Sequence, residues 1–185
     1  MDTPLLYTVH NGDVIGCKLL IDNGADCSVR NRADMTITWA AAYCGHADLL
    51  RCLIVHGNPS LSVPSRGLVF EYDGPHPPYI YAVAHTPLYV AIERKHFAVA
   101  EVLIDAGVMM CEEKWCCSIT SLSPLSLPER LRSRLSLAVL SPPSLQHIAC
   151  HCLRRHFGQQ ILTVVPVLEI PKTLKDSLAL LSLMK

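Results

Sequence analysis

The residues best suited to chemistry in this sequence are cysteines and histidines in two short clusters. One cluster is Cys116-Cys117 and the other is Cys150-His151-Cys152. A zinc site needs ligands that converge, commonly from Cys-x₂₋₄-Cys spacing. Adjacent cysteines diverge, and on a helix residues i and i+2 point to different sides. The spacing therefore does not favour zinc, and we expect no metal site.

A cysteine near a histidine could also act as a nucleophile. Cys44 has His46 nearby and Cys150 is beside His151, and a neighbouring histidine can activate a thiol. Neither pair is accompanied by a glycine loop that would stabilise an oxyanion. The sequence contains no P-loop, Gly-x-Gly-x-x-Gly, Gly-x-Ser-x-Gly or His-Glu-x-x-His motif. We therefore expect no enzyme, no catalytic residue and no cofactor.

The bulk composition favours a protein that binds other proteins. Sixteen basic and 16 acidic side chains among 185 residues give a formal net charge of zero, which favours neither nucleic acid nor a membrane surface. Half of the residues are hydrophobic and mean hydropathy is +0.29, yet no apolar run approaches the roughly 18–20 residues of a membrane helix. We expect apolar faces that partners cover. Nine scattered cysteines and no visible signal peptide predict reduced thiols in a cytoplasmic or nuclear protein.

The elements that carry these residues begin with a C-terminal helix. Pro142 and Pro143 suit a helix start, Ser141 or Ser144 can cap it, and Gly158 suits a left-handed residue just past its end. Its apolar side falls at i, i+3, i+4 spacing and comprises Leu145, Ile148, Ala149, Cys152, Leu153 and His156. A helix this short is not stable alone, so something must cover that side.

The order Leu145, Ala149, Leu153 on this helix resembles the BC box that opens a SOCS box, the element that docks on Elongin C. The family prefers Cys at the middle position, where Ala149 stands here. The run Arg154-Arg155-His156-Phe157-Gly158 resembles the usual ending of the family's helix. The resemblance implies that Leu145, Ile148, Ala149 and Leu153 contact Elongin C, with Leu145 as the anchor.

Residues 168–171, Leu-Glu-Ile-Pro, resemble the Cullin-5 box, whose pattern is Leu-Pro-aliphatic-Pro. The resemblance implies cullin contacts from Leu168, Ile170 and Pro171. Glu169 departs from the first proline of the pattern. The two boxes together cover residues 144–183, and we predict a SOCS box over residues 144–185.

Three upstream segments repeat one another. They begin at Thr3, Thr36 and Thr86, so the first period is 33 residues and the second is 33 plus an insertion of 17. A 33-residue period headed by Thr-Pro-Leu resembles the ankyrin repeat, and the resemblance spans residues 3–108. It implies an all-α solenoid of helix pairs with finger turns, followed by a small three-helix SOCS box.

The repeat landmarks predict how the helices begin and end. Thr-Pro starts the first helix of a pair, and Gly12 and Gly45 turn between the helices. Left-handed glycines end the second helix of each pair, at Gly24, Gly57 and Gly107. Lys95 replaces glycine at the third inter-helix turn, where we expect slight strain. We expect repeat one to present an uncovered face through Leu5, Val9 and Ile15, as in a shortened repeat protein or one whose end another element covers.

Two further segments interrupt or follow the predicted repeats of residues 1–108. The insertion 66–82 carries three prolines that exclude helix and four aromatic residues. We expect a loop there that either binds a partner or packs on neighbouring fingers. Residues 109–143 form a linker, in which residues 128–140 read as a short amphipathic helix with a solvated arginine face.

The groove and finger tips of a repeat stack are its usual binding surface. By register this surface includes Tyr7, His10, Asn31, Arg32, Tyr43, Glu93 and Arg94. Arg32, Tyr43 and Arg94 are the leading candidates for target binding, because Tyr and Arg are frequent interface hot spots.

The two resemblances together identify the chain as a member of the ankyrin repeat and SOCS box family. Members of that family are substrate receptors of cullin-RING ubiquitin ligases. The resemblance implies that the stack binds a protein target, which the sequence does not identify, while the SOCS box binds Elongin B/C and Cullin-5 with its RING subunit. Two alternatives stay open: an ankyrin interaction module without a ligase role, and a truncated competitor for Elongin B/C.

Overall fold

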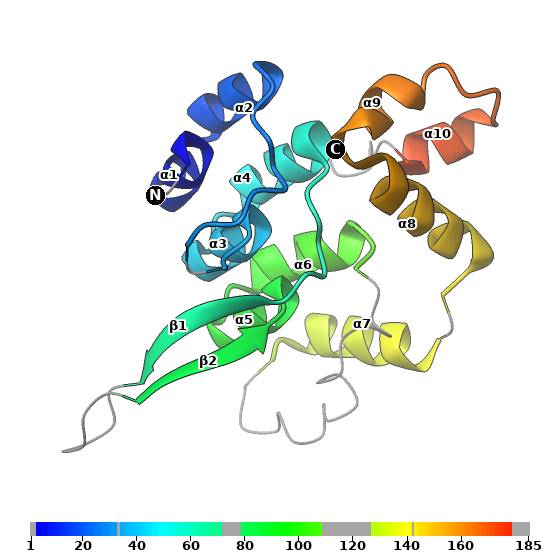
Figure 1. Ribbon diagram of the computed structural model, residues 1–185. Helices are drawn as coiled ribbons and strands as arrows, with labels where there is room; N and C mark the ends of the chain where they lie inside the picture. The colour runs from blue at the N-terminus through cyan, green and yellow to red at the C-terminus, as the bar shows by residue number, and fades with distance from the viewer. Residues whose placement is uncertain (1–2, 33, 72–78, 109–126, 142, 179–185) are drawn as a thin grey trace.

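The computed structural model describes residues 3–32, 34–71, 79–108, 127–141 and 143–178, whose helices form a stack and a C-terminal module (Figure 1). The stack consists of three helix pairs: α1 (Pro4–Asn11) with α2 (Val14–Asp22), α3 (Ile37–Cys44) with α4 (Ala47–Cys52), and α5 (Pro87–Glu93) with α6 (Phe97–Asp105). The C-terminal module comprises α8 (Leu145–Phe157), the 3-10 turn η4 (Gly158–Gln160), α9 (Ile161–Val164) and α10 (Lys172–Leu178). The predicted all-α solenoid followed by a small three-helix unit is confirmed.

The first helix of each pair begins where the Thr landmarks predict. The hydroxyl oxygens of Thr3, Thr36 and Thr86 accept hydrogen bonds of 3.2, 3.2 and 3.3 Å from the backbone N–H three residues later. Pro4 and Pro87 occupy the first helical position, where a missing N–H leaves no hydrogen bond unmade. The caps therefore fix the register of all three repeats.

The turns inside the helix pairs explain why glycine recurs there. Gly12 and Gly45 have φ of 70° and 83°. A Cβ at Gly12 would come within 2.9 Å of the His46 ring, and one at Gly45 within 2.6 Å of the His96 ring, so each glycine leaves room for an imidazole of the next repeat. Lys95 takes the same left-handed conformation at φ 62°, as predicted, and this costs roughly 1–2 kcal/mol relative to glycine.

The core of the stack lies between successive pairs. Ala40, Ala41 and Ala42 on α3 are fully buried, and their small side chains let α1 and α5 approach α3 closely. Larger side chains fill the space between the two layers of helices, notably Leu49, Leu50, Leu53, Leu88 and Leu103. Dense burial of this kind supplies most of the stability of a repeat stack.

Repeat two ends differently from the other repeats. Helix α4 continues into η1, a π-helical turn (Leu53–Gly57), and the left-handed residue that follows is Asn58, with φ 43°. Gly57 lies inside the turn, where a Cβ would come within 2.5 Å of the Cys27 sulfur. The prediction that Gly57 is the left-handed terminator is therefore wrong, while Gly24 and Gly107, both at φ 84°, confirm it for their repeats.

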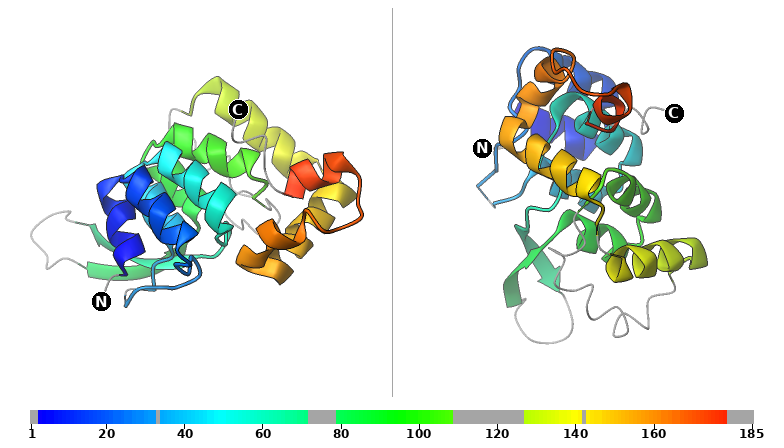
Figure 2. Two further views of the ribbon diagram at one scale, coloured as in Figure 1. Left: turned by 90° about the horizontal axis from the view of Figure 1, so that it is seen from above. Right: turned by 90° about the vertical axis from the view of Figure 1, so that its right-hand side faces the viewer.

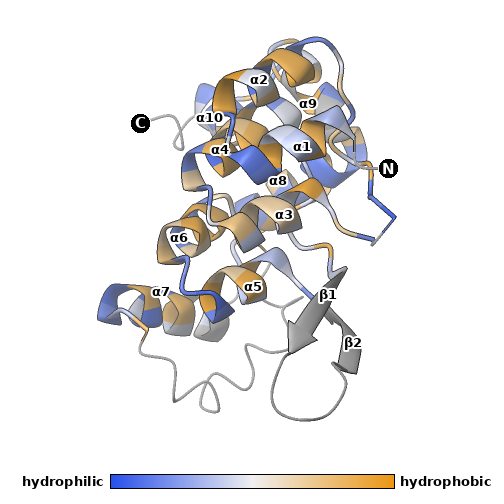
Figure 3. Ribbon diagram, turned by 90° about the vertical axis from the view of Figure 1, so that its left-hand side faces the viewer, coloured by the Kyte–Doolittle hydropathy of each residue, from blue (hydrophilic) through white to orange (hydrophobic). Residues whose placement is uncertain are grey.

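The outer surface of repeat one is only partly as predicted. Leu5 and Val9 are buried in the core rather than uncovered, because they face α3. Ile15 is 84% exposed, and Tyr7 and Leu19 are exposed with it. Figure 3 faces α1 and α2 and shows hydrophobic residues on both helices.

The insertion between repeats two and three contains two antiparallel strands, one at each end. Strand β1 (Ser65–Glu71) pairs antiparallel with β2 (Tyr79–His85) and projects away from the stack (Figure 1). The strands are rich in β-branched and aromatic residues, which favour extended backbone. The structure therefore has two strands in the segment predicted to be a loop. At the base of the hairpin, the Thr36 N–H donates to the Ser65 hydroxyl at 2.9 Å. The prolines lie within residues 72–78, outside the described residues.

Helix α7 (Glu129–Leu140) confirms the predicted amphipathic helix and covers the last repeat. Leu131 and Leu135 are 1% exposed and belong to the same core as the stack. Arg134, which flanks these leucines on α7, pairs with Asp105 of α6 at 2.5 Å. The arginines of α7 are solvated, as predicted, but Arg134 also ties α7 to the stack.

The C-terminal module lies beside the stack instead of extending its row (Figure 2). Its own small core is formed by Ile161, Val165 and Leu178. Helix α8 is the part of the module nearest the stack, and it lies across the ends of the second helices of repeats two and three.

Candidate protein-interaction surfaces

Helix α8 begins one residue after its cap. The Ser144 hydroxyl accepts a 3.2 Å hydrogen bond from the His147 N–H, so Ser144 rather than Ser141 caps the helix. Pro143 precedes the cap and does not enter the first turn. Gly158 has φ 51° and ψ −132°, a conformation that only glycine adopts readily. The sharp exit at Gly158 lets the chain turn back into η4 and α9.

One side of α8 is apolar and open to solvent. Leu145 is 82% exposed and Ile148 is 37% exposed, and Ala149 and Cys152 on the same side are also exposed. We call these four residues the open stripe. They follow the i, i+3, i+4, i+7 spacing of one helix face. Exposed large apolar residues grouped on one face mark a surface that another molecule covers.

Leu153 does not lie in the open stripe. At about 100° per residue it stands roughly 80° around the helix from Leu145. It is half-buried and packs on the module's own core beside Phe157 and Ile170. The four residues predicted to contact Elongin C therefore divide into three that are exposed and one at the edge of the internal core.

The opposite side of α8 is polar and joined to the stack. The Asn58 amide donates to the Gly158 carbonyl at 2.6 Å and to the Arg154 carbonyl at 3.4 Å. His147 packs on Gly107, where a Cβ would come within 2.8 Å of its ring. We call these contacts the joint. They use the left-handed residues that end repeats two and three, so the two terminators also serve as docking points.

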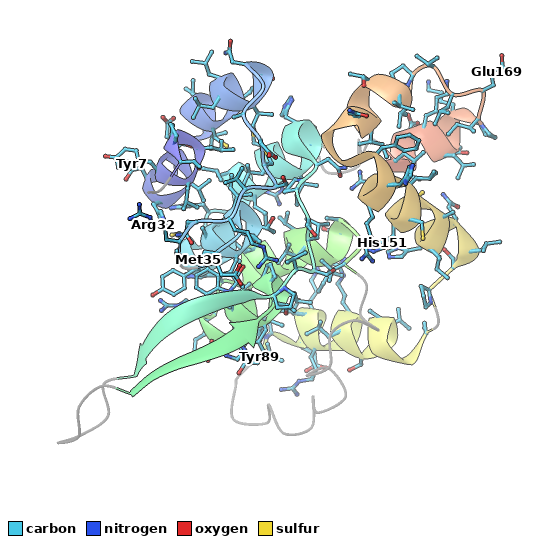
Figure 4. All side chains as sticks on the ribbon, in the orientation of Figure 1. Tyr7, Arg32, Met35, Tyr89, His151 and Glu169 are labelled. Carbon is cyan, nitrogen blue, oxygen red and sulfur yellow. The ribbon has the colours of Figure 1, made fainter. Side chains whose placement is uncertain are left out.

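A cavity of about 690 Å³ lies between the stack and the C-terminal module, and both apolar and polar side chains line it. Figure 4 places His151 on the side of α8 that faces the stack. Arg154 also borders the cavity, and its guanidinium donates to the Leu178 carbonyl through Nε at 3.0 Å and through Nη2. Burial lowers the pKa of Arg154 to about 10, so it stays charged at neutral pH and ties α8 to α10.

The segment predicted to bind a cullin links α9 to α10. Leu168 and Ile170 are half-buried, and Ile170 packs on the module's core. Pro171 and Glu169 are exposed, and Figure 4 shows Glu169 at the corner of the module farthest from the stack. The Lys175 ammonium donates to the Pro166 carbonyl at 3.0 Å and holds the ends of the segment together. The exposed side chains of Glu169 and Pro171 are accessible to another protein.

The residues predicted for target binding lie in α3, just after α5 and on the finger before α3. The Arg94 guanidinium carbon lies 3.6 Å from the centre of the Tyr43 ring. Tyr43 in turn stacks on Trp39, with ring centroids 5.1 Å apart and planes 18° from parallel. Arg32 is exposed on the preceding finger, and Figure 4 shows it with Tyr7 along one edge of the stack. The structure thus brings Tyr43 and Arg94 together and leaves Arg32 on a neighbouring element.

Comparison with family models decides the classification. The model described as ankyrin repeats (3 copies) matches residues 5–113, and the SOCS box model matches residues 141–178. The chain belongs to the ankyrin repeat and SOCS box family. A search of curated proteins finds no match to it. SOCS boxes generally bind Elongin B/C and Cullin-5 and so act as adaptors of cullin E3 ligases, and ankyrin repeats are protein-binding modules.

Both modules of this ankyrin repeat and SOCS box protein are non-catalytic interaction modules. Cys116 and Cys117 lie outside the described residues. Cys150 is half-buried and Cys152 is exposed, on different sides of α8. Burial raises the pKa of the Cys150 thiol, and the charge of Arg154 offsets only part of that rise.

Within the described residues, no helix has the length and apolar character needed to cross a bilayer.

Two residues of the joint were not singled out by sequence reasoning. Asn58 follows a glycine at a helix end, a position where Asn often takes the left-handed conformation. That signal is present in the sequence but does not reveal what the amide binds. His147 lies in the first turn of the SOCS box helix, and only the fold brings its ring onto Gly107.

Proposed function

We propose that this chain is the substrate receptor of an Elongin B/C–Cullin-5 E3 ubiquitin ligase. In this proposal the open stripe of α8 binds Elongin C, Leu168, Ile170 and Pro171 contact Cullin-5 with its RING subunit, and the ankyrin stack binds the target. The observation that carries it is the 82% exposure of Leu145 on a helix of a matched SOCS box. A leucine of this kind is stabilised when a partner pocket covers it.

The proposed mechanism is proximity. The receptor breaks and forms no covalent bond itself. By holding a target lysine near the loaded conjugating enzyme, it turns an encounter in solution into an event within one complex and raises the effective concentration of the lysine. The joint between stack and SOCS box supports this role, because it fixes the direction from target to ligase.

The residues of α8 take different parts in the proposed binding. Leu145 is the anchor that enters a pocket of Elongin C, and Ile148 flanks it. Ala149 is small, which lets a partner helix come close. Leu153 packs on the SOCS box core, so we propose that it supports the shape of the binding helix and contacts Elongin C only at its edge.

Copurification with Elongin B/C tests the proposal. We expect Leu145→Ala to weaken binding by about 30-fold or more, the loss typical of an interface hot spot. The matched control is Leu137→Ala, which removes a leucine that is 68% exposed on α7, outside the SOCS box, and should bind as the unaltered chain does. Equal binding by both variants would refute the assignment of α8.

Glu169 favours a second candidate function. A SOCS box that binds Elongin B/C but recruits no cullin would compete with active receptors for Elongin B/C. Glu169 stands exposed where the cullin box pattern has proline. Mixing the chain with Elongin B/C, Cullin-5 and its RING subunit, followed by gel filtration, separates the two: a receptor elutes with the cullin, and a competitor elutes with Elongin B/C alone.

A further inference from the structure

Arg94, Tyr43 and Trp39 form a group of stacked side chains on α3 and at the end of α5. A guanidinium carbon 3.6 Å from a ring centre is in van der Waals contact with the ring face. Trp39 is buried and stacks on the Tyr43 ring. The contact with Tyr43 holds the Arg94 guanidinium in place. Because Arg94 is exposed, its N–H groups reach solvent.

Half of the ten arginines in the sequence form ion pairs among the described residues, and Arg94 is not one of them. Five arginines form ion pairs with a carboxylate, namely Arg30, Arg51, Arg130, Arg132 and Arg134. Among the described side chains, none of the ion pairs includes Arg94. Its guanidinium lies on the face of the Tyr43 ring. A stacked guanidinium keeps its planar fork of donors available for a carboxylate.

The neighbouring charges leave this position positive. Glu93, Arg94 and Lys95 are adjacent and all three are exposed. Two of them are positive and one is negative, so together they carry one net positive charge. Burial raises the pKa of the Cys44 thiol, and the nearby charge of Arg94 opposes that rise.

We propose that Arg94, held on Tyr43, binds an Asp or Glu side chain of the target protein, and that the target segment lays an apolar or aromatic neighbour on Tyr43. This inference rests on the proposed function, in which the stack binds the target. It adds the chemical class of the target's recognition segment: an acidic side chain within an otherwise uncharged stretch. An acidic side chain would complement the charge of Arg94, which forms no ion pair with the described carboxylates and is held on the Tyr43 ring.

Peptide pools test the proposal without knowledge of the target. The probes are seven-residue peptides, acetylated and amidated to remove terminal charges, with Glu, Asp, Gln or Asn fixed at the centre and uncharged residues elsewhere. Fluorescence polarisation with the full chain should give at least about tenfold tighter binding for the acidic pools than for the amide pools, as expected for a charge-assisted pair. Arg94→Gln should abolish this difference.

Two variants control the measurement. Arg94→Lys keeps the charge but loses the planar fork, so it should keep only part of the preference. Arg132→Gln removes one exposed positive charge from α7 and should keep all of it. Equal binding of all pools, no binding by any pool, or an acidic preference that survives in Arg94→Gln would overturn the proposal. Elongin B/C capture is measured in the same samples, because failure of capture with an intact acidic preference sinks the ligase role and not this one.

Discussion

Helices α7 and α8 follow one another in the chain and are both amphipathic, yet one buries its apolar side in the stack and the other exposes it. Helix α7 buries Leu131 and Leu135 in the core of the stack and points its arginines outward or across to α6. Helix α8 turns Leu145 and Ile148 to solvent and uses its polar side to contact the stack. An apolar helix face in a sequence therefore predicts only that other side chains bury it. The fold determines whether those side chains come from the same chain or from a partner.

The largest effect expected from this comparison is on stability. Leu135→Ala should lower the free energy of unfolding by about 2–5 kcal/mol, because it empties a fully buried site between α7 and the stack. Leu137→Ala, two residues along the same helix and exposed, should change it by less than about 0.5 kcal/mol. Urea denaturation of both variants measures the difference, and similar midpoints would mean that α7 does not close the stack.

The joint should contribute less. Asn58→Gly keeps the left-handed backbone and removes only the amide that donates to the carbonyls at the end of α8. We expect a loss of about 1 kcal/mol in the docking of α8, seen as faster hydrogen exchange in residues 154–158. Asn23→Ala, which removes a 2.7 Å amide hydrogen bond local to α2, serves as the control and should leave exchange in α8 unchanged.

Substitution of the exposed Glu169 is expected to strengthen Cullin-5 binding. If proline matters at the second position of the cullin box, Glu169→Pro should tighten Cullin-5 binding by a few-fold, because it restores the pattern and stiffens the segment before binding. Titration of the Elongin B/C complex with Cullin-5 measures this. Weaker or unchanged binding would show that the departure at Glu169 is tolerated.

The smallest expected effect completes the contrast between the two helices. Leu145→Ala should leave the free energy of unfolding of the isolated chain within about 0.5 kcal/mol, since Leu145 is 82% exposed. Thermal unfolding of the chain without Elongin B/C checks this. A loss near that of Leu135→Ala would mean that the chain itself covers the open stripe in solution.

Much of the stack follows from local residues. The Thr caps, the glycine turns and even the positive φ of Lys95 are set by residues within a few positions, and the sequence predicts each of them. The end of repeat two does not follow, because the π-helical turn depends on how Gly57 packs against Cys27 of the previous finger. That contact spans 30 residues and leaves no local signal.

The candidate sites divide in the same way. Helix spacing alone predicts Leu145 and Ala149 as neighbours on an apolar side, and both are exposed there. The place of Leu153 depends on α9 and α10 covering one flank of α8, which spacing cannot supply. Tyr43 and Arg94 are 51 positions apart, and only the stacking of α3 on α5 brings them into contact.

Lys95 has a consequence for the length of the molecule. At the first two turns, a bare glycine receives the imidazole of the repeat that comes after it. Lys95 carries a Cβ at the equivalent third turn, and by analogy with Gly12 and Gly45 that atom would stand close to the imidazole of any further repeat. We therefore expect that adding a fourth ankyrin repeat after the third would require Lys95→Gly.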